Sequence, residues 1–289
     1  MSNSFSGKIA LVTGTSSGIG LSTAVLLAQS GFTVIATMRD TAKASRLQAR
    51  IREAGVNVEV DRLDVQDDAS VAGCVQEAIK TYGRIDLLVN NAGAGYLGSL
   101  EQTPPRDLRR TMEVNFFGVW RVTQAVFPLM RAARSGRILT VTSVGGLIGQ
   151  PFNDAYCAAK FAVEGFMESL APVARRLGIE VSLIEPGAVN TEFVGSVQAF
   201  LHETTREPQE GYGPMLAAYL TATQQTFATI GQTPEEIGQV IVEAATTDIP
   251  HFRYATSEVI RALVSRKYVD PTGDSIIALA GARLPQVEP

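Results

Sequence analysis

Short runs of aliphatic and β-branched residues alternate along the chain with longer segments in which apolar residues recur at helical spacing. The short runs, such as Ile9–Val12 and Ile138–Val141, are almost continuously apolar, which is typical of strands covered on both faces of a sheet. The pattern predicts strands at Lys8–Thr13, Thr33–Thr37, Asn57–Arg62, Leu87–Asn90, Arg137–Ser143, Glu180–Ile184 and Phe252–Ala255. It predicts helices at Ile19–Gln29, Thr41–Ala54, Asp67–Tyr82, Pro104–Ala133, Asp154–Leu177 and Pro234–Ala245.

This alternation predicts an α/β fold of the Rossmann type, a doubly wound parallel sheet of about seven strands with helices on both faces. Since no Pro- or Gly-rich linker and no internal repeat divides the chain, we expect one domain over residues 1–289. The rhythm breaks at Asn190–Ile230, a Gln- and Thr-rich segment that begins just after a strand end. Because ligands bind at the carboxyl ends of parallel strands, we expect a substrate cover at about 190–230. The alternative to a substrate cover is a pair of surface helices without a functional role. We also expect a C-terminal extension at about 256–289.

Composition excludes several classes of function. The chain has 25 Lys+Arg and 29 Asp+Glu, a formal net charge of −4, so electrostatics gives no basis for binding nucleic acid or an anionic membrane. The two cysteines, Cys74 and Cys157, and the two histidines, His202 and His251, leave little material for a metal cluster, and we expect none. The apolar runs are too short for a signal peptide or a transmembrane segment. We therefore expect a cytoplasmic protein.

A glycine-rich turn, Thr13–Gly20, follows the first predicted strand and leads into a helix. Glycines permit a tight turn and let backbone N–H groups approach a pyrophosphate, to which the helix start adds its positive end. The spacing G-x-x-x-G-x-G differs from the common G-x-G-x-x-G, and a purely structural turn is the alternative. Its position after the first strand favours a nucleotide. The predicted phosphate-binding residues are Gly14, Thr15, Ser16, Ser17, Gly18, Ile19 and Gly20.

The same residues also fit a competing motif. Gly14-Thr15-Ser16-Ser17-Gly18 matches G-x-S-x-G, the nucleophile elbow of α/β-hydrolases, and His251 could complete a serine hydrolase by its order in the chain. The elbow normally follows several strands, whereas this turn follows the first. The hydrolase is therefore the remote alternative.

The end of the second strand predicts which dinucleotide binds. A carboxylate at this place binds the 2′-hydroxyl of the adenosine ribose, and an arginine accepts a 2′-phosphate. Met38 is neutral and Arg39 follows it, which favours NADP(H) over NAD(H). Asp40 argues against this preference, because in a slightly longer turn its carboxylate would bind the 2′-hydroxyl of the ribose. A second alternative is that Arg39 and Asp40 are both solvated charges of the turn.

Candidate catalytic residues lie at the end of the fifth strand and on the helix after it. Ser143 ends the strand, Tyr156 follows thirteen residues later, and Lys160 stands four residues further on. Gly149–Asn153 is predicted to be a loop, with Asn153 or Asp154 as the helix cap. Tyr156 and Lys160 are then at positions i and i+4 and share one helix face.

These residue types suit proton transfer to a carbonyl. A phenol has a pKa of about 10, and a neighbouring ammonium would lower it. Tyr156 could then donate a proton to a carbonyl oxygen as hydride arrives, or remove one from an alcohol, while Ser143 hydrogen-bonds the same oxygen. Lys160 would also hold the hydroxyls of the nicotinamide ribose. An ordinary exposed Tyr–Lys helix pair is the alternative, and the glycine turn argues against it.

The chain resembles the short-chain dehydrogenase/reductase family from Lys8 to about Ala245. The matching motifs are Thr13–Gly20, Asp64-Val65, Asn90-Asn91-Ala92-Gly93, Asn115, Ser143, Tyr156-x-x-x-Lys160 and Pro186-Gly187. The resemblance implies that Asp64 and Val65 contact the adenine and that Asn91, Ala92 and Gly93 lie behind the cofactor. It also implies that Asn115 supports a water-mediated proton relay to the lysine; a helix asparagine that bonds a local carbonyl is the alternative. The segment Pro186–Thr191 would cover the nicotinamide, with Pro186, Gly187, Val189 and Thr191 at the cofactor.

A narrower resemblance is to the 17β-hydroxysteroid and retinol dehydrogenase branch. It rests on Ala36–Asp40, Gly95–Glu101, Arg253-Tyr254 and Asp270–Asp274, and that branch prefers NADP(H). Steroid-handling members carry a histidine in the cover, near the place where this chain has Gly213-Pro214. A carbonyl reductase for another bulky apolar ketone is therefore equally compatible with the sequence. Family members usually pair through the two long helices after the fourth and fifth strands, which implies a homodimer or homotetramer.

The sequence thus predicts an NADP(H)-dependent oxidoreductase that transfers a hydride between nicotinamide and a bulky apolar alcohol, ketone or aldehyde. Its catalytic residues would be Ser143, Tyr156, Lys160 and Asn115, with Ser143 and Tyr156 also binding the substrate. The alternative from another class is an NADP(H)-sensing binding protein that keeps the fold without turnover.

Overall fold

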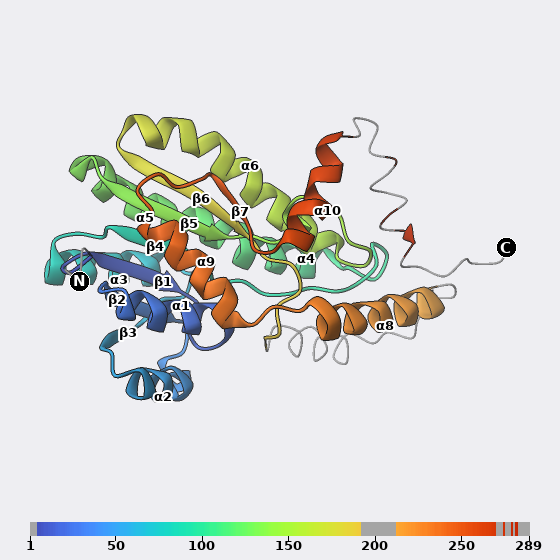
Figure 1. Ribbon diagram of the computed structural model, residues 1–289, viewed down its shortest axis with the longest axis horizontal. Helices are drawn as coiled ribbons and strands as arrows, with labels where there is room; N and C mark the ends of the chain where they lie inside the picture. The colour runs from blue at the N-terminus through green and yellow to red at the C-terminus, as the bar shows by residue number, and fades with distance from the viewer. Residues whose placement is uncertain (1–4, 192–211, 270–273, 275–278, 280, 283–289) are drawn as a thin grey trace.

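The structure, a computed structural model, describes residues 5–191, 212–269, 274, 279 and 281–282. Seven strands form one parallel sheet in the order β3-β2-β1-β4-β5-β6-β7 (Figure 1). The strands are β1 (Ile9–Thr13), β2 (Thr33–Met38), β3 (Val58–Arg62), β4 (Leu87–Asn90), β5 (Gly136–Val141), β6 (Ile179–Glu185) and β7 (Arg253–Ala255). The predicted doubly wound Rossmann-type fold is confirmed.

Helices cover both faces of this sheet. The principal helices are α1 (Gly18–Gln29), α2 (Ser45–Ala54), α3 (Asp68–Tyr82), α4 (Pro105–Met112), α5 (Gly118–Ala133), α6 (Asp154–Arg176), α8 (Tyr212–Ile230), α9 (Pro234–Thr246) and α10 (Glu258–Val269). One hydrophobic core joins the sheet to α1, α2 and α9, and a second joins it to α3, α5 and α6.

The alternation of side chains along β1 produces these two cores. Ala10 and Val12 point into the core under α1 and α9, whereas Ile9 and Leu11 point into the core under α3, α5 and α6. All four are buried, as the continuous apolar run predicts. The sheet is therefore covered on both faces, and its carboxyl edge is the place left for a ligand.

Two helical segments differ from the sequence prediction. The segment expected as one helix over Pro104–Ala133 is interrupted by a π-helical turn at Glu113–Phe117, which contains Asn115. The segment expected to start at Thr41 begins with a 3₁₀ turn, Thr41–Lys43, before α2. Single π turns often occur at functional sites, and this one interrupts the helix at a predicted site residue.

Two further helices, α8 and α10, lie where the sequence predicts the substrate cover and the C-terminal extension. Residues 192–211 of the expected cover lie outside the described residues, as do most residues after Val269. Among the helices that the structure describes, none is both long enough and apolar enough to cross a membrane.

Candidate active site

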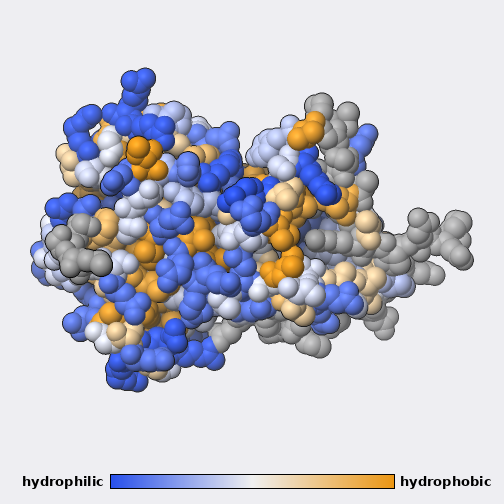
Figure 2. Space-filling model, in the orientation of Figure 1, coloured by the Kyte–Doolittle hydropathy of each residue, from blue (hydrophilic) through white to orange (hydrophobic). Residues whose placement is uncertain are grey.

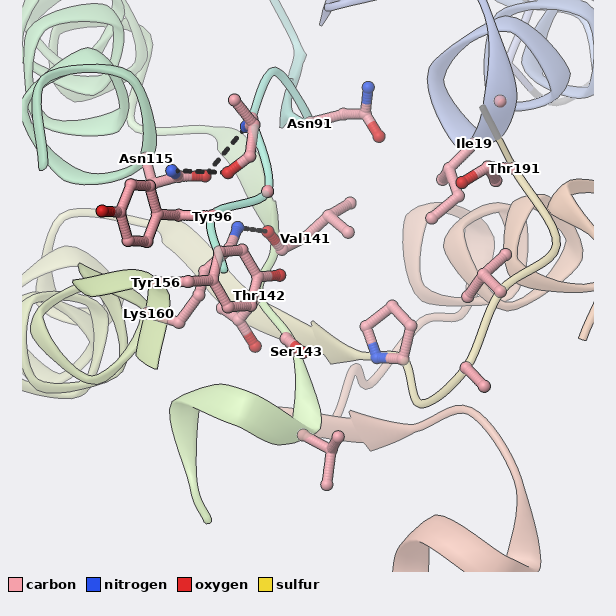
Figure 3. Close-up of a pocket in the computed structure, with 18 of the residues that line it drawn as sticks. Ile19, Asn91, Tyr96, Asn115, Val141, Thr142, Ser143, Tyr156, Lys160 and Thr191 are labelled. Carbon is pink, nitrogen blue, oxygen red and sulfur yellow. Dashed lines mark hydrogen bonds between the residues drawn. The ribbon is translucent and has the colours of Figure 1, made fainter. Parts of the chain in front are cut away.

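A cavity of about 1730 Å³ runs along the carboxyl edge of the sheet, from the glycine turn after β1 to α8 and α10. Figure 2 shows hydrophobic residues gathered beside the base of α10. Most predicted site residues line this cavity: Gly14, Ser16, Ser17, Gly18, Ile19, Arg39, Asp64, Val65, Asn91, Ala92, Gly93, Asn115, Ser143, Tyr156, Lys160, Pro186, Gly187, Val189 and Thr191. Figure 3 shows several of them converging on it.

The glycine turn has the shape that the motif requires. Gly14 and Gly18 have φ of +72° and +56°, a backbone region that favours glycine. A Cβ on Gly14 would lie 2.7 Å from the Ala92 Cα, and one on Gly20 would lie 2.3 Å from the Asn91 Nδ2. The turn therefore packs directly against the loop after β4, and α1 begins at Gly18 with its amino end at the cavity.

Two predicted phosphate contacts, Thr15 and Gly20, point into the fold instead of lining the cavity. Thr15 is fully buried, and its hydroxyl donates to the Thr37 carbonyl at 3.1 Å. Gly20 supplies only the space that Asn91 needs. The Asn91 Nδ2 in turn donates to the Thr13 and Gly14 carbonyls at 2.9 and 3.0 Å. Thr15, Gly20 and Asn91 therefore brace the turn.

The end of β2 presents an arginine to the cavity and turns the neighbouring carboxylate away. Arg39 is exposed and lines the cavity, while Met38 is buried. Asp40 accepts a hydrogen bond from the Ala42 N–H at 3.1 Å and caps the short 3₁₀ turn. Its carboxylate is therefore engaged by the backbone. Arg46, at the start of α2, also lines the cavity, a contribution that no motif indicated.

Asp64 and Val65 line the cavity at the loop after β3. The Asp64 carboxylate accepts from the Gln66 N–H at 3.1 Å, which fixes the turn that carries it. Ser70 also accepts from the Asp64 N–H at 3.0 Å.

Ser143, Tyr156 and Lys160 lie together beyond the end of β5 (Figure 3). The strand ends at Val141, so Thr142 and Ser143 lie just beyond it, and the Ser143 Oγ accepts from the Gly145 N–H at 3.0 Å. Tyr156 and Lys160 are both buried on α6, and the Lys160 Nζ lies 5.8 Å from the centre of the Tyr156 ring. The predicted one-face arrangement of the pair is present in the structure.

Burial controls the titration of this pair. It raises the pKa of the Tyr156 phenol to about 12, an effect that a hydrogen bond with Ser143 opposes. It lowers the pKa of the Lys160 ammonium to about 8, an effect that Glu164 opposes. The expectation that Lys160 lowers the tyrosine pKa is not met in this structure. The Lys160 Nζ donates instead to the Val141 carbonyl at 3.1 Å, and desolvation of the phenol outweighs other influences.

Asn115 makes the local backbone contacts of the second interpretation, while the proton relay stays a prediction. It is fully buried in the π turn, and its Nδ2 donates to the Ala94 and Thr111 carbonyls at 2.9 and 3.0 Å. A Cβ on Gly93 would lie 2.9 Å from the Asn115 Oδ1 and 3.8 Å from the Lys160 Nζ. Asn115 thus satisfies local backbone groups and also reaches the neighbourhood of Lys160.

The segment after β6 closes one side of the cavity. The Pro186 carbonyl accepts from the Val144 N–H at 2.8 Å, which ties this segment to the loop that follows Ser143. Val189 pairs with Gln232, and a Cβ on Gly18 would lie 3.3 Å from the Thr191 methyl group. The segment therefore spans from the loop after Ser143 to the glycine turn. Its contact with the nicotinamide stays a prediction.

The hydrolase alternative is excluded by this topology. Ser16 follows the carboxyl end of β1, whereas His251 precedes the amino end of β7. Because all strands are parallel, these two ends lie at opposite edges of the sheet, and β4, β5 and β6 separate the two strands. The two side chains cannot share a site.

Comparison with known proteins agrees with the geometry. The model of the family described as short chain dehydrogenase matches residues 8–201. The chain belongs to this family. It is 40% identical over 275 residues to retinol dehydrogenase 8 of Bos taurus, covering 92% of this chain and 86% of that protein. It is 39% identical over 275 residues to 17-beta-hydroxysteroid dehydrogenase type 1 of Homo sapiens, covering 93% and 83%.

Solved structures support the same assignment. A short-chain dehydrogenase/reductase from Burkholderia phymatum in complex with NAD has a TM-score of 0.80 at 26% identity, covering 99% of this chain and 98% of that one. A metagenomic short-chain oxidoreductase in complex with NADP has a TM-score of 0.69 at 27% identity, covering 87% and 97%. The expected kinship with the retinol and hydroxysteroid dehydrogenases is thus confirmed, and the protein is a short-chain oxidoreductase of a family that binds nicotinamide cofactors.

The substrate side of this short-chain dehydrogenase contains residues that no motif marked. The Asn153 Nδ2 donates to the Tyr219 hydroxyl at 2.9 Å and to the Pro151 carbonyl at 2.9 Å. Neither Asn153 nor Asp154 therefore makes the expected side-chain cap, because the Asn153 amide points to α8. Tyr219 packs with Leu97 and Phe152, which anchors α8 beside the start of α6. Only the three-dimensional contact between distant segments reveals this group.

Proposed function

We propose that the protein is an NADP(H)-dependent short-chain alcohol dehydrogenase or carbonyl reductase acting on a bulky apolar substrate. The observation that carries the proposal is that Ser143, Tyr156 and Lys160 line the same cavity as the glycine turn. A dinucleotide-binding turn and a proton donor thus share one site. The kinship with retinol and hydroxysteroid dehydrogenases supports an alcohol or carbonyl as the reacting group.

The residues present fit a dinucleotide. The Gly14–Gly20 turn leaves backbone space that a Cβ would fill, and the amino end of α1 faces the cavity. Ser16, Ser17, Gly18 and Ile19 would hold the pyrophosphate, Asp64 and Val65 the adenine, and the segment Pro186–Thr191 the nicotinamide. When bound, the nicotinamide supplies or accepts the hydride.

The protein's own residues would handle the proton. Tyr156 donates its phenolic proton to the carbonyl oxygen of the substrate during reduction and withdraws one from the alcohol in the reverse direction. Ser143 hydrogen-bonds that oxygen and stabilises its developing charge. Lys160 would hold the ribose hydroxyls, and its ammonium would stabilise the negative charge that forms on Tyr156 once the proton has left, although burial keeps the Tyr156 pKa high beforehand. Asn115 positions this lysine from the π turn.

The preference for NADP(H) rests on the end of β2. Arg39 lines the cavity, where a guanidinium can accept a 2′-phosphate. Asp40 is occupied by its backbone hydrogen bond to Ala42, so its negative charge is held at the cap of the 3₁₀ turn. Arg46 adds a second positive charge to the same cavity. These features favour the phosphorylated dinucleotide.

The proposed substrate is bulky and apolar because of the walls on the substrate side. Val144, Leu220, Phe227 and Leu263 line the cavity and give it apolar walls. The helix α8 contains no histidine between Tyr212 and Ile230. A steroid, a retinoid and another bulky ketone therefore all remain substrates to test.

We also propose a homodimer or homotetramer formed through α5 and α6, in the cytoplasm. Phe117 and Trp120 are 46% and 45% exposed, and Phe161 of α6 is 38% exposed. Trp120 stacks on Phe166 of α6 with ring centres 4.5 Å apart, which forms a continuous aromatic surface across the two helices. Large exposed aromatic surfaces are typical of subunit interfaces.

A cofactor and substrate screen tests the proposal. Absorbance of the reduced nicotinamide is followed with NADPH or NADH and a panel of steroid ketones, retinal-like aldehydes and other bulky ketones. We expect turnover with NADPH on at least one apolar carbonyl. Binding of NADPH without turnover of any carbonyl or alcohol would instead support the cofactor-sensing alternative, and an absence of NADPH binding would refute both.

A further inference from the structure

A cluster of charged residues that includes two buried carboxylates lies next to the proposed catalytic pair. Arg253, the first residue of β7, contacts three carboxylates: Glu164 and Glu168 of α6 and Glu185 at the end of β6. The Arg253 guanidinium lies 2.7 Å from Glu185 and 2.7 Å from Glu168. The side chains of Glu164 and Glu185 are only 6% and 2% exposed, whereas that of Glu168 is 68% exposed.

Glu164 differs from the other two carboxylates because it also contacts the strand that leads to Ser143. Its Oε1 accepts a hydrogen bond from the Thr142 hydroxyl at 2.5 Å. Thr142 stands between Val141, whose carbonyl accepts from Lys160, and Ser143. The Glu164 carboxylate thus holds Thr142 in place. Thr142 lies between Val141, which Lys160 contacts, and Ser143.

The loop after Ser143 is packed against the same side chain. A Cβ on Gly146 would lie 2.9 Å from the Glu164 Cγ and 3.1 Å from the Lys160 carbonyl. Gly146 is buried and belongs to the short 3₁₀ turn that Ser143 starts. Glu164 therefore contacts the chain on both sides of Ser143.

The balance of buried charge points to Lys160 as the second partner of Glu164. Arg253 is already compensated by Glu185, which is the more deeply buried of its carboxylates. Lys160 is a buried cation on the same face of α6, one turn before Glu164. A buried cation is stable only with a compensating charge, and Glu164 opposes the effect of burial on the Lys160 pKa.

The other groups around this pair are few. Tyr156 faces Lys160 from α6, and the contact from β5 is the neutral Val141 carbonyl. Gly93 and Asn115 approach it from the loop after β4 and from the π turn, and both are neutral. Around Glu164 stand Arg253 of β7, Glu185 of β6 and Lys267 of α10. Burial lowers the pKa of Lys267, an effect that Glu164 opposes. Glu164 is therefore the carboxylate that links Lys160 to the wider network.

We propose that Glu164 is a positioning residue for the reaction: it fixes Thr142 between the Lys160 contact and Ser143, and it keeps Lys160 in the ammonium form. The effect on catalysis rests on the proposed function. The contacts of Glu164 with Thr142 and with Arg253 do not depend on it. A structural ion pair would serve only to neutralise Arg253. Glu164 in addition supports the charge that the proposed proton transfer requires.

The direct test is the titration of Lys160 by NMR with lysine labelled at Cε. The chain has five lysines, so a Lys160→Met variant assigns the signal. Replacing Glu164 by Gln keeps an acceptor for Thr142 and removes the charge, so the Lys160 midpoint should fall by about one pH unit. The matched control is Glu168→Gln, which removes an exposed partner of the same arginine and should leave the midpoint unchanged. An unchanged midpoint in Glu164→Gln would overturn the proposal.

Turnover supplies the second measurement. As the pH rises, carbonyl reduction by Glu164→Gln should begin to decline at a lower pH than it does in the wild type. The reason is that Lys160 in this variant loses its proton at a lower pH. Thr142→Val keeps the charge and removes the contact, so it should lower kcat while the Lys160 midpoint stays in place. If Glu164→Gln does not fold, Glu164→Asp, which keeps the charge, should retain the wild-type midpoint, and a lowered midpoint there would contradict the proposal. The NMR result decides the effect on Lys160 even if the wild type reduces no carbonyl in the screen.

Discussion

Single residues at the cavity determine how charge is distributed over the proposed cofactor site. Burial raises the pKa of Tyr156 to about 12 and lowers that of Lys160 to about 8. A neutral phenol is therefore the dominant form near neutral pH, and it has a proton to donate. This protonation state suits carbonyl reduction, in which Tyr156 acts first as an acid.

Arg39 offers a prediction at the same scale. Replacing it by alanine should weaken NADPH binding about 10- to 100-fold, since a charge-assisted hydrogen bond contributes about 1.5–3 kcal/mol. The dissociation constant for NADH should change about twofold or less. Fluorescence titration of the reduced cofactors measures both values. The control is Arg52→Ala. Arg52 is an arginine of α2 that does not line the cavity, so its replacement should leave the dissociation constants for NADPH and NADH unchanged. Equal weakening for NADPH and NADH in Arg39→Ala would show that Arg39 does not contact the phosphate.

Among the elements, the strands were the most predictable part of the chain. Successive residues such as Ala10 and Leu11 point into opposite apolar cores, so burial on both faces leaves a continuous hydrophobic signal. The glycine turn and the Tyr156–Lys160 pair were also readable because their spacing is local. The π turn at Asn115 was not, since its extra residue per turn leaves no periodic signature.

The substrate side could not be derived from local patterns. Asn153 occupies the N-cap position of α6, as its place in the sequence indicates, yet its amide bonds to Tyr219, which is 66 residues away in the chain. The Glu164–Arg253 pair is separated by 89 residues and likewise follows from the packing of β6 and β7. Contacts of this kind depend on tertiary structure, which hydrophobic periodicity does not specify.

The helix α8 gives a prediction at this scale. Tyr219→Phe keeps the ring among Leu97 and Phe152 and removes only the hydrogen bond to Asn153. The KM for a bulky carbonyl should rise about 2- to 10-fold, the effect expected of one hydrogen bond, because α8 is less firmly docked. The affinity for NADPH should not change.

The comparison variant for this experiment is Thr221→Ala. Thr221 is exposed on the same helix, and its hydroxyl donates locally to the Ala217 carbonyl. It should leave the KM at the wild-type value. An unchanged KM in Tyr219→Phe would mean that the Asn153 contact does not position the substrate wall.

For the molecule as a whole, the aromatic surface on α5 and α6 predicts self-association. Trp120 is 45% exposed and stacks on Phe166, so an arginine at position 120 places a charge in the proposed interface. Light scattering after size-exclusion chromatography should show an oligomer for the wild type and a smaller species for Trp120→Arg. Ile249→Arg is the control, because Ile249 is 85% exposed but lies before β7, away from α5. A monomeric wild type would contradict the proposed oligomer.

The central claim is that Tyr156 transfers the proton at a site built to hold a dinucleotide. It is tested most directly by measuring kcat and NADPH affinity together in Tyr156→Phe, with Tyr82→Phe, a surface change, as the control. We predict that kcat falls about 100- to 10,000-fold, the contribution typical of general acid catalysis, while the dissociation constant for NADPH stays within about twofold. Wild-type turnover in Tyr156→Phe would contradict the account.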